Sequence, residues 1–327
     1  CKTNANYAYR QQKFFIIKPD KAPYSLCANS YAKGFRLAGF FTEKAFSSEL
    51  DNDYIKSFAP DYVMCFDFTE LKEGLLQELK QINPNCKFIF NFLTKLDEKR
   101  EKANIELLNN FESIVFTADK DNLAILPNAH YLPVGVSCKK YKTVFQGYRN
   151  TVTVMSNPDN INVLKTIIDL IIHFGKISIY ADEFDYINSL ENELWAEYDD
   201  VHLFELYKAS YKGECSKEKD RARVFSSSVI TVVPQTDMQH GVDYRIFEGI
   251  ASSGFVLCES NPEIKRLFDI GHELETYEKP FELIDKVKFY LKNPNIASAI
   301  GDNARRAAVN NHSVLIRVKK ILEFCDK

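Results

Sequence analysis

The sequence predicts an α/β protein of two consecutive domains, each built around a parallel β-sheet. Short apolar runs alternate with amphipathic segments along the whole chain, which is the pattern of repeated strand–helix units. The pattern restarts near residue 150, and 327 residues fit about two domains. The hydrophobic fraction of 45% and the charged fraction of 27% are ordinary for a globular protein, and they exclude a disordered or collagen-like chain.

The first half of the sequence is predicted to form five strands separated by helices. Compact apolar runs predict the strands at 13–18, 61–66, 86–92, 113–117 and 131–134. Helical spacing of apolar residues predicts helices at 25–41, 53–58, 70–82 and 96–111. Pro60 and Pro84 stand where two of these helices end, because proline does not continue a helix.

The second half repeats this arrangement. Its predicted strands lie at 151–156, 177–181, 201–206, 229–233 and 255–259. Its predicted helices lie at 159–174, 183–198, 216–225, 244–252, 263–268, 280–292, 295–308 and 314–324. Two such units indicate two Rossmann-like domains joined near residues 147–150. A ligand is then expected in the cleft between the domains, off the carboxyl ends of the strands.

Charge is distributed unevenly between the two halves. Residues 1–150 hold 21 basic and 17 acidic residues, whereas residues 151–327 hold 21 and 28. The excess of positive charge in the first half indicates an acidic partner or peripheral contact with a membrane surface, and unevenly solvated faces explain it equally well. The sequence has no apolar run long enough to span a bilayer. It also lacks the basic, aromatic-interleaved stripe of nucleic-acid binders, so no nucleic-acid partner is expected.

The eight cysteines indicate a reducing compartment. None stands in a CxxC pair, and Cys65, Cys86 and Cys258 lie inside apolar runs, where a reduced cysteine behaves as a small hydrophobe. We therefore expect a cytoplasmic protein, with the inner face of the membrane as an alternative location. The chain begins at Cys1 rather than at Met, so we expect that the natural N-terminus is absent. A lipid-anchored cysteine would look the same, but the seven further unpatterned cysteines argue against export.

The segment from residue 229 to residue 259 is the most informative part of the chain. Asp243 is placed to cap a helix that starts at Tyr244, and Gly254 is placed to end it. The loop before Asp243 offers backbone N–H groups at the carboxyl end of a strand, which is suited to a pyrophosphate. Glu248 could accept hydrogen bonds from the two ribose hydroxyls of a nucleotide. Alternatively, Arg245 and Glu248 pair with each other on the helix surface, since they are three residues apart.

Several motifs carry a resemblance to a known family. They are RVFSSSVITVV, HGVDYRIFEGIASSGFVLCE, LFDIGHELETYEKPFELIDKVKFYLKNP and IGDNARRAAVNNHSVLIRVKKIL. They resemble the donor half of GT-B glycosyltransferases, in particular the CgeB-like, family-1-type bacterial enzymes. FAPDYVMCF, CKFIFNF and HYLPVGV in the first half resemble that family more loosely. The resemblance implies a GT-B fold: an acceptor domain at 1–147, a donor domain at 148–311, and a terminal helix at 312–327 that crosses back to the first domain.

The resemblance also implies roles for individual residues. Glu248 matches the acidic residue that binds the donor ribose, and Gly241, Val242 and Asp243, with Tyr244 at the helix start, match the loop that holds the diphosphate. Arg245 matches a family arginine that orients Glu248. His240 stands where the large retaining families have a glutamate, so their retaining mechanism cannot be carried over. A histidine there could bind the sugar or the phosphate, or it could be an ordinary loop residue.

Other candidate residues are expected at the ends of strands. Ser156 and Asn157 follow the first strand of the second domain and could meet phosphate or sugar. Tyr207 is a candidate for stacking on the base, with an exposed tyrosine on a loop as the alternative. In the first domain Asp67 is the candidate general base for an inverting transfer, with a helix cap as its alternative role. Two DxD triplets occur, at 51–53 and 119–121, and chance is the better explanation for both. We therefore expect no required metal or other cofactor, because helix ends can stabilise the departing diphosphate.

These observations together predict an enzyme that moves a sugar from a UDP- or GDP-linked donor to a hydroxyl. The expected acceptors are a glycan, a lipid-linked glycan or a protein of the bacterial surface. A sugar-nucleotide 2-epimerase, a non-catalytic two-domain sugar-binding protein and a silent GT-B domain remain as alternatives at this point.

Overall fold

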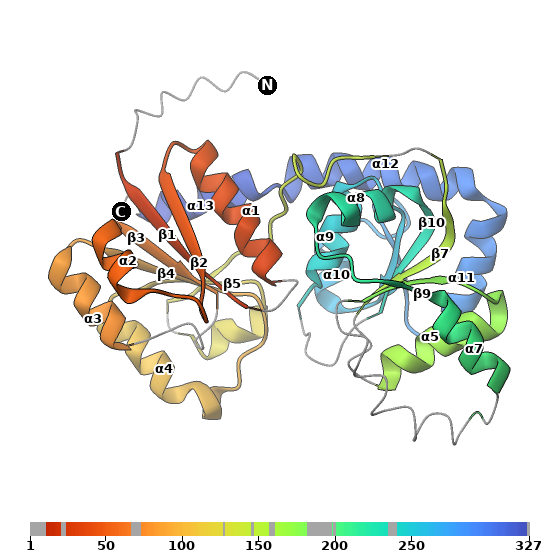
Figure 1. Cartoon of the computed structure of the whole chain (residues 1–327), viewed down its shortest axis with the longest axis horizontal. Helices are drawn as coiled ribbons and strands as arrows, with labels where there is room; N and C mark the ends of the chain where they lie inside the picture. Colours follow the sequence, from red (N-terminus) through yellow and green to blue (C-terminus); the bar gives the residue numbers. More distant parts are fainter. Residues whose placement is uncertain are drawn as a thin grey trace. The chain divides into compact units, whose positions relative to one another are not determined.

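The computed structural model describes residues 11–20, 24–66, 73–126, 128–144, 147–156, 161–181, 198, 201–234 and 241–325 (Figure 1). The chain divides into two compact units, Cys1–Ser137 with His312–Lys327, and Cys138–Asn311. The division between Ser137 and Cys138 lies ten residues before the boundary at 147 expected from the sequence. None of the described helices combines the length and the hydropathy needed to cross a bilayer.

The first unit is a six-stranded parallel sheet in the order β2-β1-β3-β4-β5-β6. Its strands are β1 (Lys13–Lys18), β2 (Phe41–Phe46), β3 (Tyr62–Cys65), β4 (Lys87–Phe92), β5 (Ile114–Thr117) and β6 (His130–Tyr131). Its helices are α1 (Tyr24–Leu37), α2 (Asn52–Phe58), α3 (Glu73–Ile82), α4 (Glu98–Asn110), the 3₁₀ turn η2 (Lys120–Ala124) and α13 (Val314–Cys325). The five predicted strands of this half are all present.

Strand β2 was not predicted, because residues up to 41 were assigned to the first helix. Helix α1 instead ends at Leu37, and Gly39 follows with a φ of +96°, a conformation that favours glycine. Strand β2 lies at the edge of the sheet, where Phe41 is 60% exposed. An edge strand of this kind has no continuous apolar run, so the periodicity of its sequence does not reveal it.

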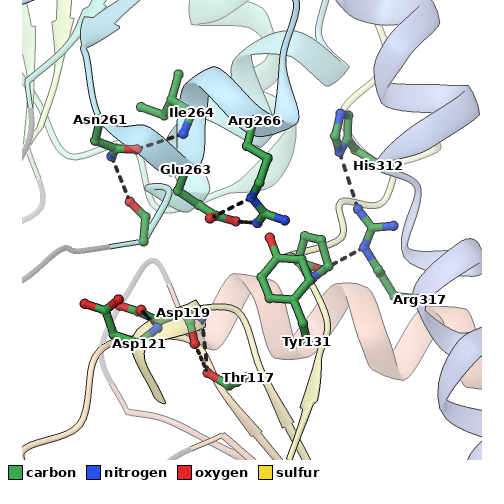
Figure 2. A network of polar contacts seen from close by, with 12 residues as sticks. Thr117, Asp119, Asp121, Tyr131, Asn261, Glu263, Ile264, Arg266, His312 and Arg317 are labelled. Carbon is green, nitrogen blue, oxygen red and sulfur yellow. Dashed lines mark hydrogen bonds and ion pairs between the residues drawn. The ribbon is translucent and has the colours of Figure 1, made fainter. Parts of the chain in front are cut away.

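Helix α13 packs against α1 in the first unit (Figure 1). A Cβ on Gly34 of α1 would lie 2.8 Å from Cγ2 of Val318, so glycine permits this close approach. Val136 N–H donates to the His312 carbonyl at 2.9 Å, and Arg317 Nε donates to the Pro133 carbonyl at 2.6 Å. Figure 2 shows Arg317 beside the His312 ring, whose Nδ1 lies 3.4 Å from Arg317 Nη2. These contacts fix the C-terminal helix to the first unit.

The second unit is also a six-stranded parallel sheet, in the order β12-β11-β10-β7-β8-β9. Its strands are β7 (Asn150–Met155), β8 (Ser178–Tyr180), β9 (Tyr211–Gly213), β10 (Ser228–Val233), β11 (Val256–Glu259) and β12 (Glu275–Tyr277). Its helices are α5 (Ile161–Phe174), α7 (Val201–Ser210), α8 (Glu218–Ser227), α9 (Tyr244–Ala251), α10 (Pro262–Leu267), α11 (Pro280–Lys292) and α12 (Pro294–Asn311). Helix α9 contacts α8 and α12, while α5 contacts α7 and α11.

The strand predicted at 201–206 is wrong, because this segment forms helix α7. Leu203 and Tyr207 are four residues apart, so they lie on one helix face, and both are buried in the core of the second unit. The short run of apolar residues is equally compatible with a buried strand or a buried helix turn. The strand of this region is β9, which was not predicted. The helix predicted at 183–198 lies almost entirely outside the described residues.

The end of α9 also differs from the prediction. Gly254 was expected to take the left-handed position after the helix, but Ser253 takes it, with a φ of 59°. Gly254 is needed for another reason: a Cβ there would lie 3.0 Å from the Phe225 carbonyl oxygen and 3.1 Å from the Phe225 Cβ. Glycine therefore permits α8 and the turn after α9 to pack closely.

The buried thiol of Cys86 gives a prediction about alkaline stability. None of the seven cysteines that the structure describes forms a disulfide. Burial raises the pKa of Cys86 to about 12, above the ordinary value of 9.0. Above about pH 9 the folded chain keeps a proton on this thiol that the unfolded chain loses. The contribution of Cys86 to the free energy of unfolding is therefore complete below about pH 9. It falls by about 1.4 kcal/mol per pH unit as the pH rises toward the pKa of the folded state.

Urea unfolding under reducing conditions, at about pH 8 and about pH 10, measures this effect. Cys86→Ala should show a smaller loss of stability between the two pH values than the wild-type chain shows. Its packing defect is the same at both pH values and cancels in the comparison. An identical pH dependence in the two proteins would contradict the assignment to this thiol.

Candidate functional site

A small pocket lies at the carboxyl ends of strands β10 and β11 in the second unit. It is lined by Val233, Pro234, Gly241, Asp243, Ile246, Cys258, Glu259, Asn261 and Ile264. The carboxyl ends of parallel strands are where open α/β sheets bind their ligands. The pocket also includes the residues that lead into helix α9, so backbone N–H groups and a helix N-terminus lie at its wall.

Asp243 begins helix α9 as the sequence predicts. Its Oδ1 accepts a hydrogen bond from the Arg245 backbone N–H at 2.7 Å, and its Oδ2 accepts one from Arg245 Nη1 at 2.9 Å. Both side chains are almost fully buried. Arg245 was expected to orient Glu248, and this is wrong, because its guanidinium pairs with the cap residue. The pair neutralises the negative charge of Asp243 beside a site that would receive an anion.

Asn261 joins the two loops that form the pocket, as Figure 2 shows. Its Oδ1 caps helix α10 by accepting from the Ile264 N–H at 2.8 Å, and its Nδ2 donates to the Gly241 carbonyl at 3.1 Å. The second bond holds the chain just before α9 against the loop after β11. Asn261 was missed from the sequence, although an Asn-Pro pair directly after a strand is a recognisable helix start.

Glu248 lies in a buried network rather than at the pocket surface. Arg221 Nε of α8 donates to both carboxylate oxygens, at 2.9 and 2.8 Å, and the Tyr141 hydroxyl donates to Oε1 at 2.6 Å. Glu248 is 0% exposed and Arg221 is 1% exposed. Burial and the adjacent carboxylate raise the pKa of Tyr141, so its hydroxyl remains a donor. The expected contact with a ribose is therefore not available in this structure, and neither is the alternative surface pair with Arg245.

The comparisons with known proteins agree on the fold and the broad class. Residues 175–323 match the sequence model of a family described as glycosyl transferase-like. Among solved structures, a glycosyltransferase from Rickettsia africae has a TM-score of 0.68 at 13% identity, covering 97% of this chain and 98% of the other. Just under half of the chain is therefore similar to this family, and the chain as a whole has the GT-B fold. A search of curated proteins finds no match.

Two further structures support the assignment of the GT-B fold over nearly all of this chain. HepE from Anabaena, solved in complex with UDP and glucose, has a TM-score of 0.70 at 12% identity and covers 97% of this chain and 100% of its own. Sucrose-phosphate synthase from Thermosynechococcus elongatus has a TM-score of 0.72 at 11% identity and covers 96% and 98%. At these identities the similarity establishes the fold alone.

The remaining candidate residues of this GT-B protein fall into three groups. Ser156 is buried directly after β7, where its N–H donates to the Tyr180 carbonyl at 3.3 Å. Tyr207 was expected to stack on a base, but it lies in helix α7 with its ring 1% exposed in the hydrophobic core, so this prediction is wrong. His240, Asp67 and Asn157 lie outside the described residues.

Both DxD triplets of the chain act as helix starts. Asp51 caps α2 by accepting from the Asp53 and Tyr54 N–H groups. Asp119 caps η2 by accepting from the Asp121 N–H at 2.9 Å (Figure 2), and the Asp121 side chain forms an ion pair with Lys95 at 2.9 Å. The described part of the chain contains no group of three His, Cys, Asp or Glu side chains arranged to hold a metal ion.

Proposed function

We propose that this chain transfers a sugar from a UDP- or GDP-linked donor to a hydroxyl group of an acceptor. The observation that carries the proposal is the pocket at the carboxyl ends of β10 and β11, which adjoins the start of helix α9. This pocket lies inside the segment that matches the glycosyl transferase-like family. The ligands in the HepE complex, UDP and glucose, support a nucleotide sugar as the donor class.

Backbone groups are proposed to hold the donor diphosphate. The lining of the pocket includes two carboxylates, Asp243 and Glu259, and no lysine or arginine side chain. Among the described lining residues, there is therefore no side-chain cation that could attract the diphosphate. The N–H groups from Gly241 to Tyr244 and the positive end of helix α9 supply this attraction instead, and such ends favour phosphate. We propose on this basis that donor binding needs no metal ion.

Glu259 is proposed to bind the sugar of the donor. It ends strand β11 at the pocket wall, and a carboxylate accepts hydrogen bonds from two neighbouring sugar hydroxyls. The proposed acceptor is a glycan, a lipid-linked glycan or a protein, and Asp67 is the proposed general base. A base in that role must lie within hydrogen-bond reach of the acceptor hydroxyl.

The proposal predicts how UDP binding responds to Asn261→Ala. This substitution removes the Nδ2 bond that holds the Gly241 carbonyl and loosens the diphosphate loop. Loss of about 1 kcal/mol should raise the Kd of UDP or GDP about fivefold, measured by calorimetry with and without EDTA. Asn303→Ala is the matched control, since Asn303 lies on α12 and contacts Arg306. Failure of both nucleotides to bind the wild-type chain, or binding only when a divalent metal is present, would contradict the proposal.

A further inference from the structure

A second, larger pocket lies at the other ends of strands β10 and β11. Its volume is about 300 Å³, and it is lined by residues from the amino end of β10, the turn before β11 and helix α12, together with Thr143 and Tyr148. All of these residues belong to the second unit. Strand β10 has six residues, so about 15–20 Å of strand separates this pocket from the candidate donor pocket. A ligand in this pocket would therefore be separate from the donor.

The floor of this second pocket is already fixed by internal hydrogen bonds. Ser226 Oγ donates to the Ser252 carbonyl at 3.0 Å and accepts from the Val144 N–H at 3.1 Å. Ser228 Oγ bonds to Thr153 Oγ1 at 2.7 Å. The ring of Phe255, which lines the pocket, packs on Tyr290 with centroids 4.4 Å apart. These contacts hold the floor in one shape, as a preformed site requires.

The rim carries polar groups with hydrogen-bonding capacity left over. Thr143 and Ser253 share one bond of 2.6 Å between their hydroxyls, which leaves one donor and several acceptor positions on the pair. Within the part of the chain that the structure describes, the side chains of Ser298 and Asp302 form no hydrogen bond, and both residues are exposed. Tyr148 adds an aromatic ring that is 46% exposed.

Ser253 both ends helix α9 and lines this pocket. It adopts a φ of 59°, the left-handed region, where glycine is the favoured residue. A serine there is less favourable for the fold than glycine would be. This is the position directly after the C-cap of the helix, where a left-handed residue commonly ends an α-helix. The hydroxyl of Ser253 points into the rim and bonds to Thr143.

The chemistry of the lining selects a neutral, polyhydroxylated ligand. The nine lining residues include five serines or threonines, two aromatic residues, of which Tyr148 also carries a hydroxyl, and one carboxylate, and none of them is Lys, Arg or His. The single charge of Asp302 repels phosphates and other anions, so this is not a second nucleotide site. Hydroxyls and a carboxylate can form hydrogen bonds with the hydroxyl groups of a sugar, and aromatic rings can pack against its C–H groups. We propose that this pocket is a non-catalytic binding site for a neutral saccharide.

Saturation-transfer NMR on the full chain tests this proposal. Glucose, galactose, N-acetylglucosamine, maltose and lactose are the probes, and saturating UDP is present so that the donor pocket is filled. At least one probe should receive saturation from the wild-type chain, and glucose 6-phosphate should compete more weakly than glucose. Because the pocket is separate from the donor pocket, UDP affinity measured in the same samples reports on the proposed function independently.

Two substitutions assign the signal to this pocket. Ser253→Gly relieves the positive φ, so the thermal midpoint should be unchanged or higher, while saccharide affinity falls about fivefold through the loss of one hydroxyl. Asp302→Asn should weaken binding of the neutral sugar and improve competition by glucose 6-phosphate. Asp285→Asn, at an exposed position on α11, is the matched control and should change neither. No saturation of any probe, or saturation that both variants leave unchanged, would overturn the proposal.

Discussion

Glu248→Ala is expected to lower the free energy of unfolding by about 3–5 kcal/mol, the range for removing one partner of a buried ion pair. The substitution leaves the Arg221 guanidinium 1% exposed, without the carboxylate that accepts from its Nε and Nη2. It also removes the acceptor of the Tyr141 hydroxyl. Urea unfolding followed by circular dichroism measures the change through the midpoint and slope of the transition.

A double variant separates the cost of an unpaired charge from the value of the pair itself. Arg221→Met with Glu248→Leu replaces both charges by apolar side chains of similar size, so it should recover most of the stability lost in Glu248→Ala. Glu263→Ala is the matched single control, because its ion pair with Arg266 on α10 is partly exposed. If Glu248→Ala were no more destabilising than Glu263→Ala, the buried network would not have the structural role assigned to it.

The same variants decide whether Glu248 also contacts the donor. In the structure its oxygens accept from Arg221 and Tyr141, so the apolar double variant should bind UDP with nearly wild-type affinity. A loss of UDP affinity of tenfold or more in a stable double variant would mean that the carboxylate leaves this network to bind a ribose. Calorimetry on the folded double variant distinguishes these outcomes without the instability of the alanine variant.

The sequence predicted elements well where local signals are strong. Helix α11 was predicted with its observed bounds, because Pro280 marks its start and apolar residues follow at helical spacing. The cap at Asp243 was also predicted, since it needs only the side chain and the next turn. The sheets were anticipated as parallel, but three of the four edge strands, β2, β9 and β12, were not among the predicted strands.

Side-chain partners far apart in the sequence could not be predicted. Glu248 and Arg245 are close in sequence and were considered as a pair, but the partner of Glu248 is Arg221, 27 residues away. Its second partner, Tyr141, is 107 residues away. Such pairings depend on how α8, α9 and the segment before β7 pack together. The prediction for Tyr207 was wrong because the burial of its side chain depends on whether the whole segment forms a strand or a helix.

His240 is expected to contribute to the chemical step, and His240→Ala should lower kcat about 100-fold. His240 is joined by one peptide bond to Gly241, which lines the candidate donor pocket. Among the described residues that line this pocket, none has a cationic side chain. None can therefore stabilise the negative charge that develops on the diphosphate as its bond to the sugar breaks. An imidazole at this position could donate a hydrogen bond to that charge or to the sugar. Such a group acts mainly in the transition state, so the substitution should change kcat far more than the affinity for UDP.

The informative comparison is between His240→Ala and His240→Gln under saturating donor. Glutamine retains a hydrogen-bond donor and cannot carry a positive charge, so it should recover part of kcat if donation alone is needed. His272→Ala is the matched control, because His272 lies in the turn before β12 and is absent from the lining of the pocket. UDP affinity should stay within about threefold of wild type in all three proteins. A nearly normal kcat for His240→Ala would remove this histidine from the mechanism and make Asp67, the proposed general base, the next residue to substitute.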